Sequence, residues 1–165
     1  MSEVGSQRSE VGKIEELYKV ESKKIEEVRE ILQKQKEMIF YINTSKDENE
    51  EKIIKEKISG IGIFNKKDNE SYYISLNENQ IQELKDIFES TEILKIGIDL
   101  SKTYILLKQE GIDLKGIKFD SSIAAYILNP TNNKLKIENL AELYLEIDVN
   151  EFLGEEVKQK NKQIN

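Results

Sequence analysis

The chain has 165 residues, of which 38% are hydrophobic and 35% are charged, and its formal net charge is −7. This length suits one hydrophobic core of ordinary size. The sequence contains no Cys and no His, which excludes thiol nucleophiles, disulfides, Cys/His zinc sites and imidazole acid–base catalysis. For an enzyme made from this chain, divalent metal held by carboxylates is the obvious candidate, and the negative net charge argues against a self-sufficient nucleic-acid binder.

The sequence predicts one domain flanked by polar ends. Residues 1–13 are expected to form a flexible tail or linker, residues 14–153 the domain, and residues 154–165 a polar tail that is truncated. No apolar run approaches the ~20 residues that cross a bilayer. The start of the chain lacks the basic and apolar stretches of a secretory signal, so a cytoplasmic protein without membrane contacts is expected.

The first half of the domain begins with a helical pattern. From Ile14 to Leu32 the apolar residues recur mostly three or four apart, which predicts one or two amphipathic helices. The apolar run from Met38 to Ile42 predicts a buried strand. The acidic run 47–51 is expected to form a loop or a short polar helix.

A hairpin is predicted next. Residues 57–64 and 71–76 have the composition of strands and are joined by the turn-forming residues 65–69. Gly60 and Gly62 in the first strand indicate a bulge or a close backbone approach. A phosphate-cradling loop is a sharper interpretation with weaker support, because no helix start follows the glycines.

Two helix-and-strand units are predicted after the hairpin. Asn77 is a plausible N-cap for a helix that leads to a strand at 94–98, an order that implies a parallel crossover; the apolar residues of that helix are Ile81, Leu84, Ile87 and Phe88. Asp99 is predicted to cap a second helix, with residues 104–107 as its apolar side and Gly111 as its end.

The last predicted elements complete the pattern. A short strand covers 117–119, Asp120 or Ser121 caps a helix that ends at Asn129-Pro130, and a final helix covers 137–145. Hairpin strands followed by strand–helix–strand units predict an α/β fold: a mixed sheet of antiparallel hairpin strands and parallel crossover strands with flanking helices. This is the ribonuclease H-like arrangement in outline, and the pattern alone is shared with other small α/β folds.

The stretch from Lys95 to Leu145 carries a family resemblance. The runs GIDLKGIKFD (111–120), AAYILNP (124–130) and IENLAELYL (137–145) resemble the 3′–5′ exonuclease domain of bacterial DNA polymerase I, a family A polymerase. The resemblance implies a ribonuclease H-like fold, DNA replication and repair as the setting, a polymerase portion of the same parent chain as partner, and contact with DNA through that parent protein. Abundant Lys, Ile, Glu and Asn suits an AT-rich bacterial genome.

The resemblance also places the catalytic positions of the family on this sequence. Proofreading members hold two divalent metals through an Asp-x-Glu on the first strand, an Asp in the helix after the crossover strand, and a later Asp. The first pair falls on Asn43 and Ser45, and the next position falls on Thr103. All three side chains are neutral, and the last motif has no counterpart before Asn165, which favours a fragment of a longer chain. A catalytically inactive, vestigial domain with no metal or other cofactor is therefore the leading hypothesis, with the isolated fragment a monomer.

Two alternatives stay open at this point. An active exonuclease could use Mg or Mn bound by displaced carboxylates, for which Asp47, Asp99 and Asp120 are the candidates, although capping is the simpler role for the last two. A non-catalytic module could instead contact single-stranded DNA or a protein through aromatic and basic residues; these are Phe64, Lys66, Lys67, Tyr72 and Tyr73. The bland interpretation of the aromatic residues is that they belong to the core or to an edge strand.

Overall fold

The computed structural model describes residues 20–46, 56–77 and 79–149. The chain divides into two compact units, Met1–Phe119 and Asp120–Asn165. The expected tails at 1–13 and 154–165 and the acidic run 47–51 lie outside the described residues. Within the described segments, no helix is both long enough and apolar enough to span a membrane.

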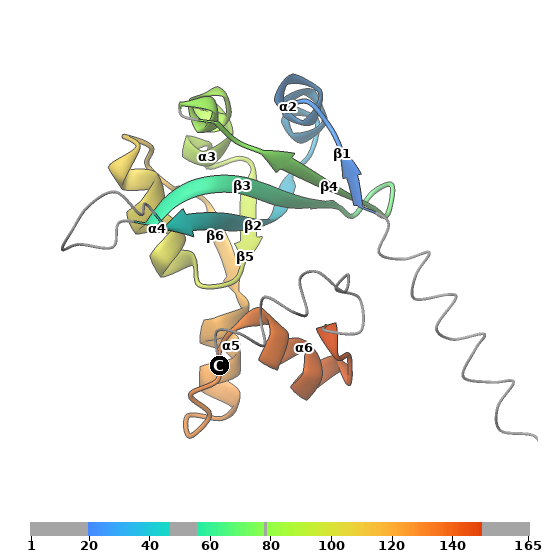
Figure 1. Ribbon diagram of the computed structural model, residues 1–165, viewed down its shortest axis with the longest axis vertical. Coiled ribbons are helices and arrows are strands. Elements are labelled where there is room, and N and C mark those ends of the chain that lie inside the picture. The colour runs from blue at the N-terminus through green and yellow to red at the C-terminus, as the bar shows by residue number, and fades with distance from the viewer. Residues whose placement is uncertain (1–19, 47–55, 78, 150–165) are drawn as a thin grey trace, which may run out of the picture. The chain divides into compact units, whose positions relative to one another are not determined.

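A six-stranded mixed sheet organises the chain (Figure 1). Its spatial order is β1-β4-β3-β2-β5-β6. β2, β3 and β4 form an antiparallel meander, whereas β5 runs parallel to β2 and β1 runs parallel to β4. The mixed sheet with flanking helices confirms the predicted fold class. The strands are β1 Val20–Ser22, β2 Glu37–Lys46, β3 Glu56–Asn65, β4 Glu70–Ser75, β5 Leu94–Gly97 and β6 Ile117–Asp120.

Helices of the first unit cover the sheet. α2 (Ile25–Gln33), the 3₁₀ helix η1 (Gln80–Leu84) and α3 (Lys85–Glu89) lie together on one side of it, and α4 (Leu100–Gln109) follows β5 (Figure 1). The core forms beneath α2 and α3 because the alternating side chains Met38, Phe40 and Ile42 of β2 all point that way and are buried. The rings of Phe40 and Phe88 meet edge to face, with centroids 5.4 Å apart.

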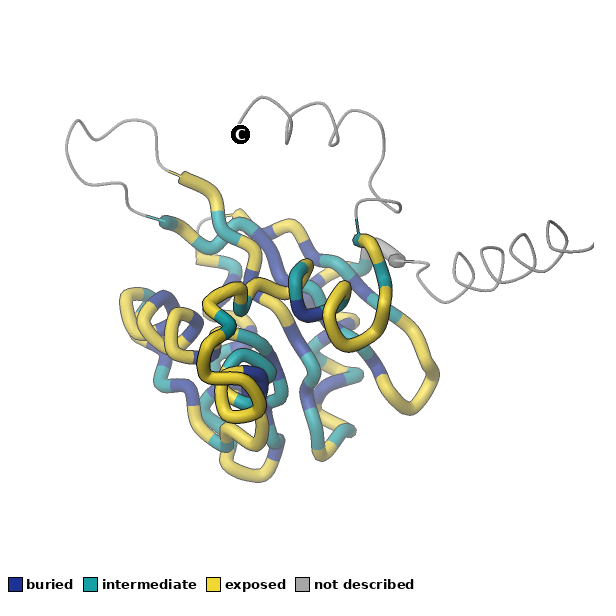
Figure 2. Tube along the Cα trace, turned by 90° about the horizontal axis from the view of Figure 1, so that it is seen from below, coloured by how far each residue is buried: buried dark blue, intermediate teal, exposed yellow. Residues whose placement is uncertain are grey.

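The second unit contains two helices, α5 (Ser121–Leu128) and α6 (Ile137–Leu145). Asp120 caps α5 because its carboxylate accepts hydrogen bonds from the backbone N–H groups of Ser122 and Ile123. Both helices fall where the sequence predicts them. Most residues of the two helices are exposed (Figure 2), and their buried side chains are Ala125 and Leu140.

The N-terminal helix is shorter than predicted. Residues 20–22 form the strand β1, and the helix starts only at Ile25; residues 14–19 lie outside the described part. The prediction of helix through 20–22 is wrong because these residues pair in parallel with residues 71–73 of β4, and strand pairing of this kind is invisible to local periodicity.

Two details of the later helices also differ. Asn77 does not cap the helix: the helical segment starts at Gln80, and the backbone N–H of Asn77 instead donates to Gln80 Oε1 at 2.8 Å. The predicted apolar residues of this segment are all buried. In α4 the apolar side is formed by Leu100, Leu106 and Leu107, whereas Tyr104 and Ile105 of the predicted side are 42% and 57% exposed.

Candidate functional site

The first candidate positions lie at the end of the central strand β2. Asn43 and Ser45 are exposed and alternate along the strand, so both side chains leave the same face of the sheet. The register with β3 shifts between Asn43, opposite Gly60, and Thr44, opposite Ile58. This is the irregularity that Gly60 and Gly62 indicate in the sequence, and three further residue pairs, from Thr44 to Lys46 of β2, follow it.

Thr103 lies in the first turn of α4. The helix begins after Asp99, which has the left-handed backbone conformation (φ 49°) and accepts a hydrogen bond from the N–H of Lys102 at 3.4 Å. Asp99 is thus a helix cap, as predicted. Thr103 is only 6% exposed and faces the interior of the first unit.

Glu56 connects the end of β2 with the start of α4. Its Oε2 atom accepts a hydrogen bond from Thr44 Oγ1 at 3.2 Å and lies 2.5 Å from Lys102 Nζ. Thr44 stands between Asn43 and Ser45, and Lys102 precedes Thr103. The contact therefore brings the end of β2 and the first turn of α4, the two segments that carry the candidate positions, close to one another.

The electrostatics of this neighbourhood are set by an ammonium group. The hydrogen bond from Lys102 is the main cause that lowers the pKa of the Glu56 carboxyl below its ordinary value; burial opposes that effect, and the charge of Lys102 adds to it. Lys102 thus balances the charge of the Glu56 carboxylate. The sequence gives no signal for Glu56, because nothing in local spacing shows that the start of β3 meets α4.

Asn43 forms a hydrogen bond with a tyrosine of β4. Its Nδ2 donates a hydrogen bond to Tyr73 Oη at 3.2 Å. The ring of Tyr73 lies across Gly60, where a Cβ atom would come within 2.2 Å of Oη and 2.6 Å of Cζ. Gly60 is therefore a close backbone approach, as one of the two predictions for it states.

The displaced carboxylates have structural roles. Asp99 caps α4 and Asp120 caps α5, while Asp47 lies outside the described residues. Among the residues that the structure describes, no three acidic side chains gather closely enough to hold a metal ion. An amide at Asn43 and hydroxyls at Ser45 and Thr103 do not supply the charge that two divalent ions require. The described residues therefore do not fit a two-metal centre.

The aromatic candidates divide between core and surface. Tyr72 is 2% exposed, its hydroxyl donates to Glu70, and burial is the main cause that raises the pKa of its phenol. Phe64 is half-buried, and the basic pair 66–67 is exposed in the hairpin turn. Tyr72 therefore belongs to the core, whereas Tyr73 is half-buried on the opposite face of β4.

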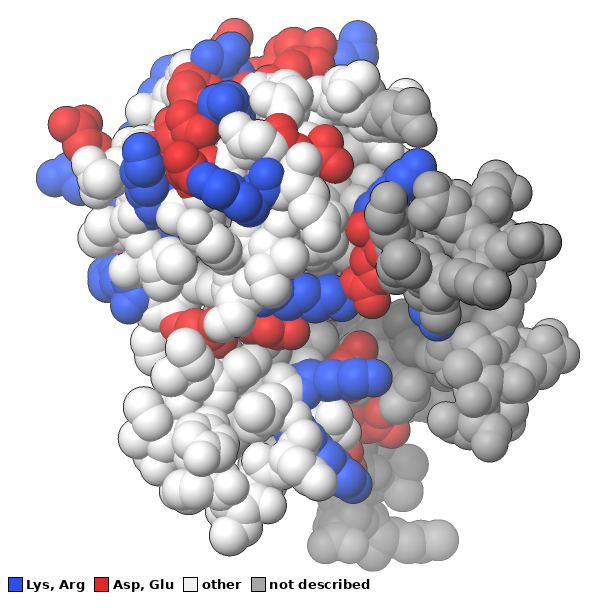
Figure 3. All heavy atoms as spheres, turned by 90° about the vertical axis from the view of Figure 1, so that its left-hand side faces the viewer, with Lys and Arg blue, Asp and Glu red and all other residues white. Residues whose placement is uncertain are grey.

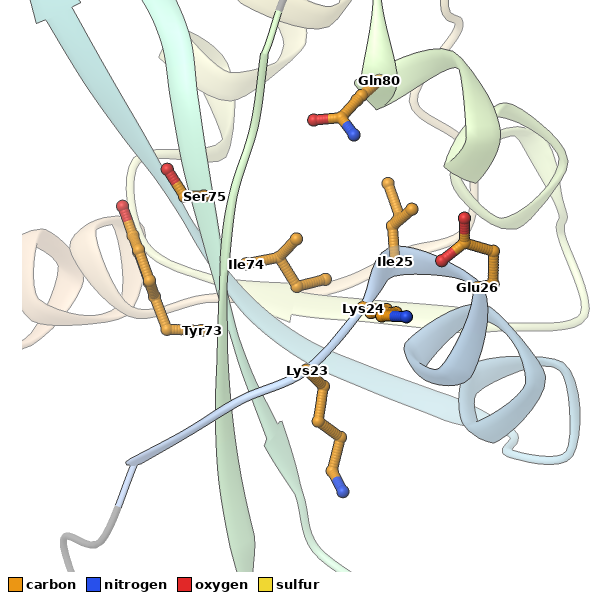
Figure 4. Close-up of a pocket in the computed structure, with 8 residues that line it drawn as sticks. All are labelled: Lys23, Lys24, Ile25, Glu26, Tyr73, Ile74, Ser75 and Gln80. Carbon is orange, nitrogen blue, oxygen red and sulfur yellow. The ribbon is translucent and has the colours of Figure 1, made fainter.

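A hollow opens beside β4, next to the start of α2 (Figure 4). It contains none of the candidate positions Asn43, Ser45 and Thr103. Its polar groups have mixed charge, with two lysines beside one glutamate. The lining residues are Lys23, Lys24, Ile25, Glu26, Tyr73, Ile74, Ser75 and Gln80.

The mixed sheet, the parallel crossover to β5 and the flanking helices define a ribonuclease H-like fold. A sequence model of the family "DNA polymerase I, ribonuclease H-like domain" matches residues 40–157. The chain belongs to this family. DNA polymerase I of Bacillus subtilis (strain 168) is 33% identical over 92 residues, which cover 54% of this chain and 10% of that relative.

Solved structures agree on the fold. The POL domain of Pol1 from M. smegmatis, in complex with a DNA primer-template and dNTP, superposes with a TM-score of 0.62 and 15% identity over 79% of this chain and 23% of that chain. The RNase D:GMP complex from Trypanosoma brucei superposes with a TM-score of 0.66 and 13% identity over 86% of this chain and 46% of that chain. At such identities the likeness concerns the fold alone.

Proposed function

We propose that this domain is a catalytically inactive 3′–5′ exonuclease-like domain of a DNA polymerase I and acts as a structural scaffold in DNA replication and repair. One observation carries the proposal: amide and hydroxyl side chains occupy Asn43, Ser45 and Thr103, the positions at which the family resemblance implies metal-binding carboxylates. The alternative of displaced carboxylates has little support, because the described candidates serve as helix caps.

The charge distribution supports an indirect role in DNA contact. Lys and Arg side chains lie beside Asp and Glu side chains on the face shown in Figure 3, without a broad basic area, and the net charge is −7. Phosphate backbones need a basic surface. The proposal therefore assigns the main DNA contacts to the polymerase portion of the parent chain, places that protein in a bacterial cytoplasm, and leaves the isolated domain a monomer.

A nuclease assay tests the proposal. The purified chain is incubated with a 5′-labelled single-stranded primer and Mg²⁺ or Mn²⁺, and the products are separated by length. No shortening is expected over a period in which an equal amount of an active proofreading exonuclease degrades the primer. Metal-dependent shortening that Asp99→Ala abolishes would contradict the proposal, because it would assign a ligand role to that carboxylate.

Metal titration gives an independent readout. Calorimetry with Mn²⁺ is expected to detect no two-site binding in the unmodified chain. The variant Asn43→Ala, Ser45→Ala, Thr103→Val serves as the matched control, because it removes the polar atoms at the three positions. Equal heats for both proteins support the proposal, and a binding heat that only the unmodified chain shows contradicts it.

A further inference from the structure

The strand β4 extends beyond the strand that pairs with its outer edge. The last residue pair between β1 and β4 is Ser22 with Tyr73, and the chain then turns into α2, which starts at Ile25. Ser75 lies two residues beyond that pair, at the end of β4. Within the described residues, β1 therefore provides no pairing partner for Ser75.

The backbone polar groups of Ser75 point towards that outer edge. The N–H of Leu76 donates to the carbonyl oxygen of Ser59 on β3 at 2.9 Å, so the backbone of Leu76 faces β3. In an antiparallel pair, the N–H and C=O groups of successive residues point to alternate edges of a strand. Those of Ser75 therefore point away from β3, and an extended chain that lies along the outer edge can pair with them.

The hollow beside β4 lies at this edge. Its volume of about 640 Å³ is within the range of about 300–1,000 Å³ that is typical of ligand pockets. Its floor is apolar, because Ile25 and Ile74 are each only 4% exposed, and the side chain of Ile74 points from β4 towards Ile25 (Figure 4). At the rim, Oε1 of Gln80 accepts a hydrogen bond from the N–H of Asn77 at 2.8 Å. The amide NH₂ of Gln80 is the group that a carbonyl oxygen of a ligand would meet.

The charges around the hollow favour a basic ligand. Glu26 lines the hollow, and Glu27 adds a second carboxylate to the first turn of α2. Of the two lysines that line the hollow, Lys23 has its ammonium group over the ring of Tyr72, 4.7 Å from the ring centroid, and its side chain points away from the hollow in Figure 4. Two carboxylates therefore outnumber the remaining lysine, Lys24. The net charge of the chain, −7, attracts a basic partner over longer distances.

We propose that the hollow is a docking site for an extended peptide segment of a partner protein, with an apolar residue over Ile25 and Ile74 and a basic residue that meets Glu26. The main chain of the segment pairs with Ser75 and so adds a short strand to the edge of β4. Alternate residues of an extended segment share a face, so an apolar and a basic residue two positions apart match the site. This docking role goes beyond the scaffold role and involves neither metal nor nucleic acid.

An NMR titration of the full chain, labelled with ¹⁵N, tests the proposal. The probe is the peptide acetyl-Thr-Val-Thr-Lys-Thr-amide. Saturable shifts are expected, with the backbone amide signals of Ser75 and Glu26 among the largest and that of Asn43 unchanged. A probe with Glu in place of Lys should bind about threefold more weakly or worse. Methylation of the probe's backbone amides, one at a time, should weaken binding at alternate positions, because alternate amides face the edge of β4.

Variants of Ser75 and of the charged rim locate the contacts. Ser75→Pro removes the N–H donor and should weaken binding by about fivefold or more, whereas Ser75→Ala keeps the donor and should change it by less than about twofold. Proline is tolerated where a strand N–H faces an unpaired edge. Glu26→Gln should weaken binding of the lysine probe, and the matched variant Lys24→Gln should not. Circular dichroism checks that all four variants keep the fold.

The proposal is overturned if millimolar peptide gives no saturable shifts, if the shifts lie away from the hollow, or if Ser75→Pro and Ser75→Ala bind the probe equally well. Should Ser75→Pro fail to fold, the methylated probes decide the same point. Equal binding of the Lys and Glu probes would contradict the assigned charge preference. Concentration-dependent shifts of the same signals without peptide would assign the hollow to a second copy of the chain and overturn the proposal. A negative result would leave the scaffold proposal unaffected.

Discussion

The ammonium group of Lys102 lies 2.5 Å from Oε2 of Glu56, the same oxygen that accepts the hydrogen bond of Thr44. This contact joins α4 to the end of β2, next to the positions where a two-metal exonuclease would hold its ions. The Glu56 carboxylate lies there, but the ammonium group of Lys102 already balances its charge. The charge of Glu56 is thus balanced without metal.

The ion pair predicts a specific pH dependence for Lys102→Met. Because the folded-state pKa of Glu56 is lowered, the pair contributes stability above the unfolded-state pKa and loses it as the pH falls through the folded-state value. Both side chains are partly exposed, at 47% for Lys102 and 34% for Glu56. The variant should therefore lose less than about 1 kcal/mol of unfolding free energy at neutral pH.

Urea unfolding of wild type and Lys102→Met at several pH values checks this prediction. The difference between the two proteins should shrink towards zero under acidic conditions, where Glu56 is protonated in both states. Lys36→Met removes another exposed lysine and one positive charge, and should show no comparable trend. A difference that grows on acidification would contradict the assigned sign.

The burial of Thr103 predicts how a carboxylate at this position would change the stability of the domain. The site is 6% exposed, so Thr103→Asp buries a charge and should lower the unfolding free energy by about 2–4 kcal/mol. Thr103→Val keeps a similar shape and adds no charge, so it should change the unfolding free energy by less than about 1 kcal/mol. Thermal unfolding followed by circular dichroism compares the two variants, and equal losses would contradict the burial argument.

The sequence is a good guide to the second half of this fold. Asp120 is predicted as a cap and accepts the expected backbone hydrogen bonds, and the helix at 137–145 has the predicted bounds. Caps and helical periodicity are local signals, so they can be recognised in the sequence alone. The strand at 38–42 is also found, although β2 extends from Glu37 to Lys46.

The features that the sequence does not predict depend on contacts between distant parts of the chain. β1 forms because residues 20–22 pair with residues 71–73, and no local pattern encodes that partner. The contact between Glu56 and Lys102, 46 residues apart by their numbering, likewise depends on tertiary structure. The family resemblance indicates the positions Asn43, Ser45 and Thr103, whereas the approach of Tyr73 to Gly60 depends on the strand register.

Gly60 provides a test of that register. Gly60→Ala would place a Cβ atom 2.2 Å from Tyr73 Oη and 3.0 Å from the carbonyl oxygen of Ile74, so the tyrosine must move and its hydrogen bond with Asn43 breaks. We expect a loss of about 1–3 kcal/mol. Gly62→Ala is the matched control, because its nearest contact is 4.0 Å away, and it should be neutral or slightly stabilising in a strand.

A double-mutant cycle separates steric conflict from a general strand effect. If the ring of Tyr73 is the obstacle, Gly60→Ala should cost less in a Tyr73→Ala background, with a coupling energy of at least about 0.5 kcal/mol. Urea unfolding of the four proteins gives that number. Additive losses would mean that the tyrosine does not lie over Gly60 in solution.

The burial of Lys95 predicts that the free energy of unfolding increases as the pH rises. The side chain is 0% exposed, its Nζ donates to the carbonyl oxygen of Ser90 at 2.5 Å, and desolvation lowers the pKa of Lys95 to about 8 from 10.5. Between these two values the unfolded chain binds more protons than the folded one, so the unfolding free energy rises with pH. Below about pH 8 the lysine is charged in both states and this contribution to the slope vanishes.

The variant Lys95→Met isolates this effect. Methionine has a similar length and no charge, so the stability of wild type relative to Lys95→Met should increase by about 1–3 kcal/mol from pH 8 to pH 10. Tyr72, whose phenol has a raised pKa, is present in both proteins, and its contribution therefore cancels. Urea unfolding at intervals across this range measures the difference. A relative stability that stays constant, or that falls with pH, would show that Lys95 reaches solvent in the folded state.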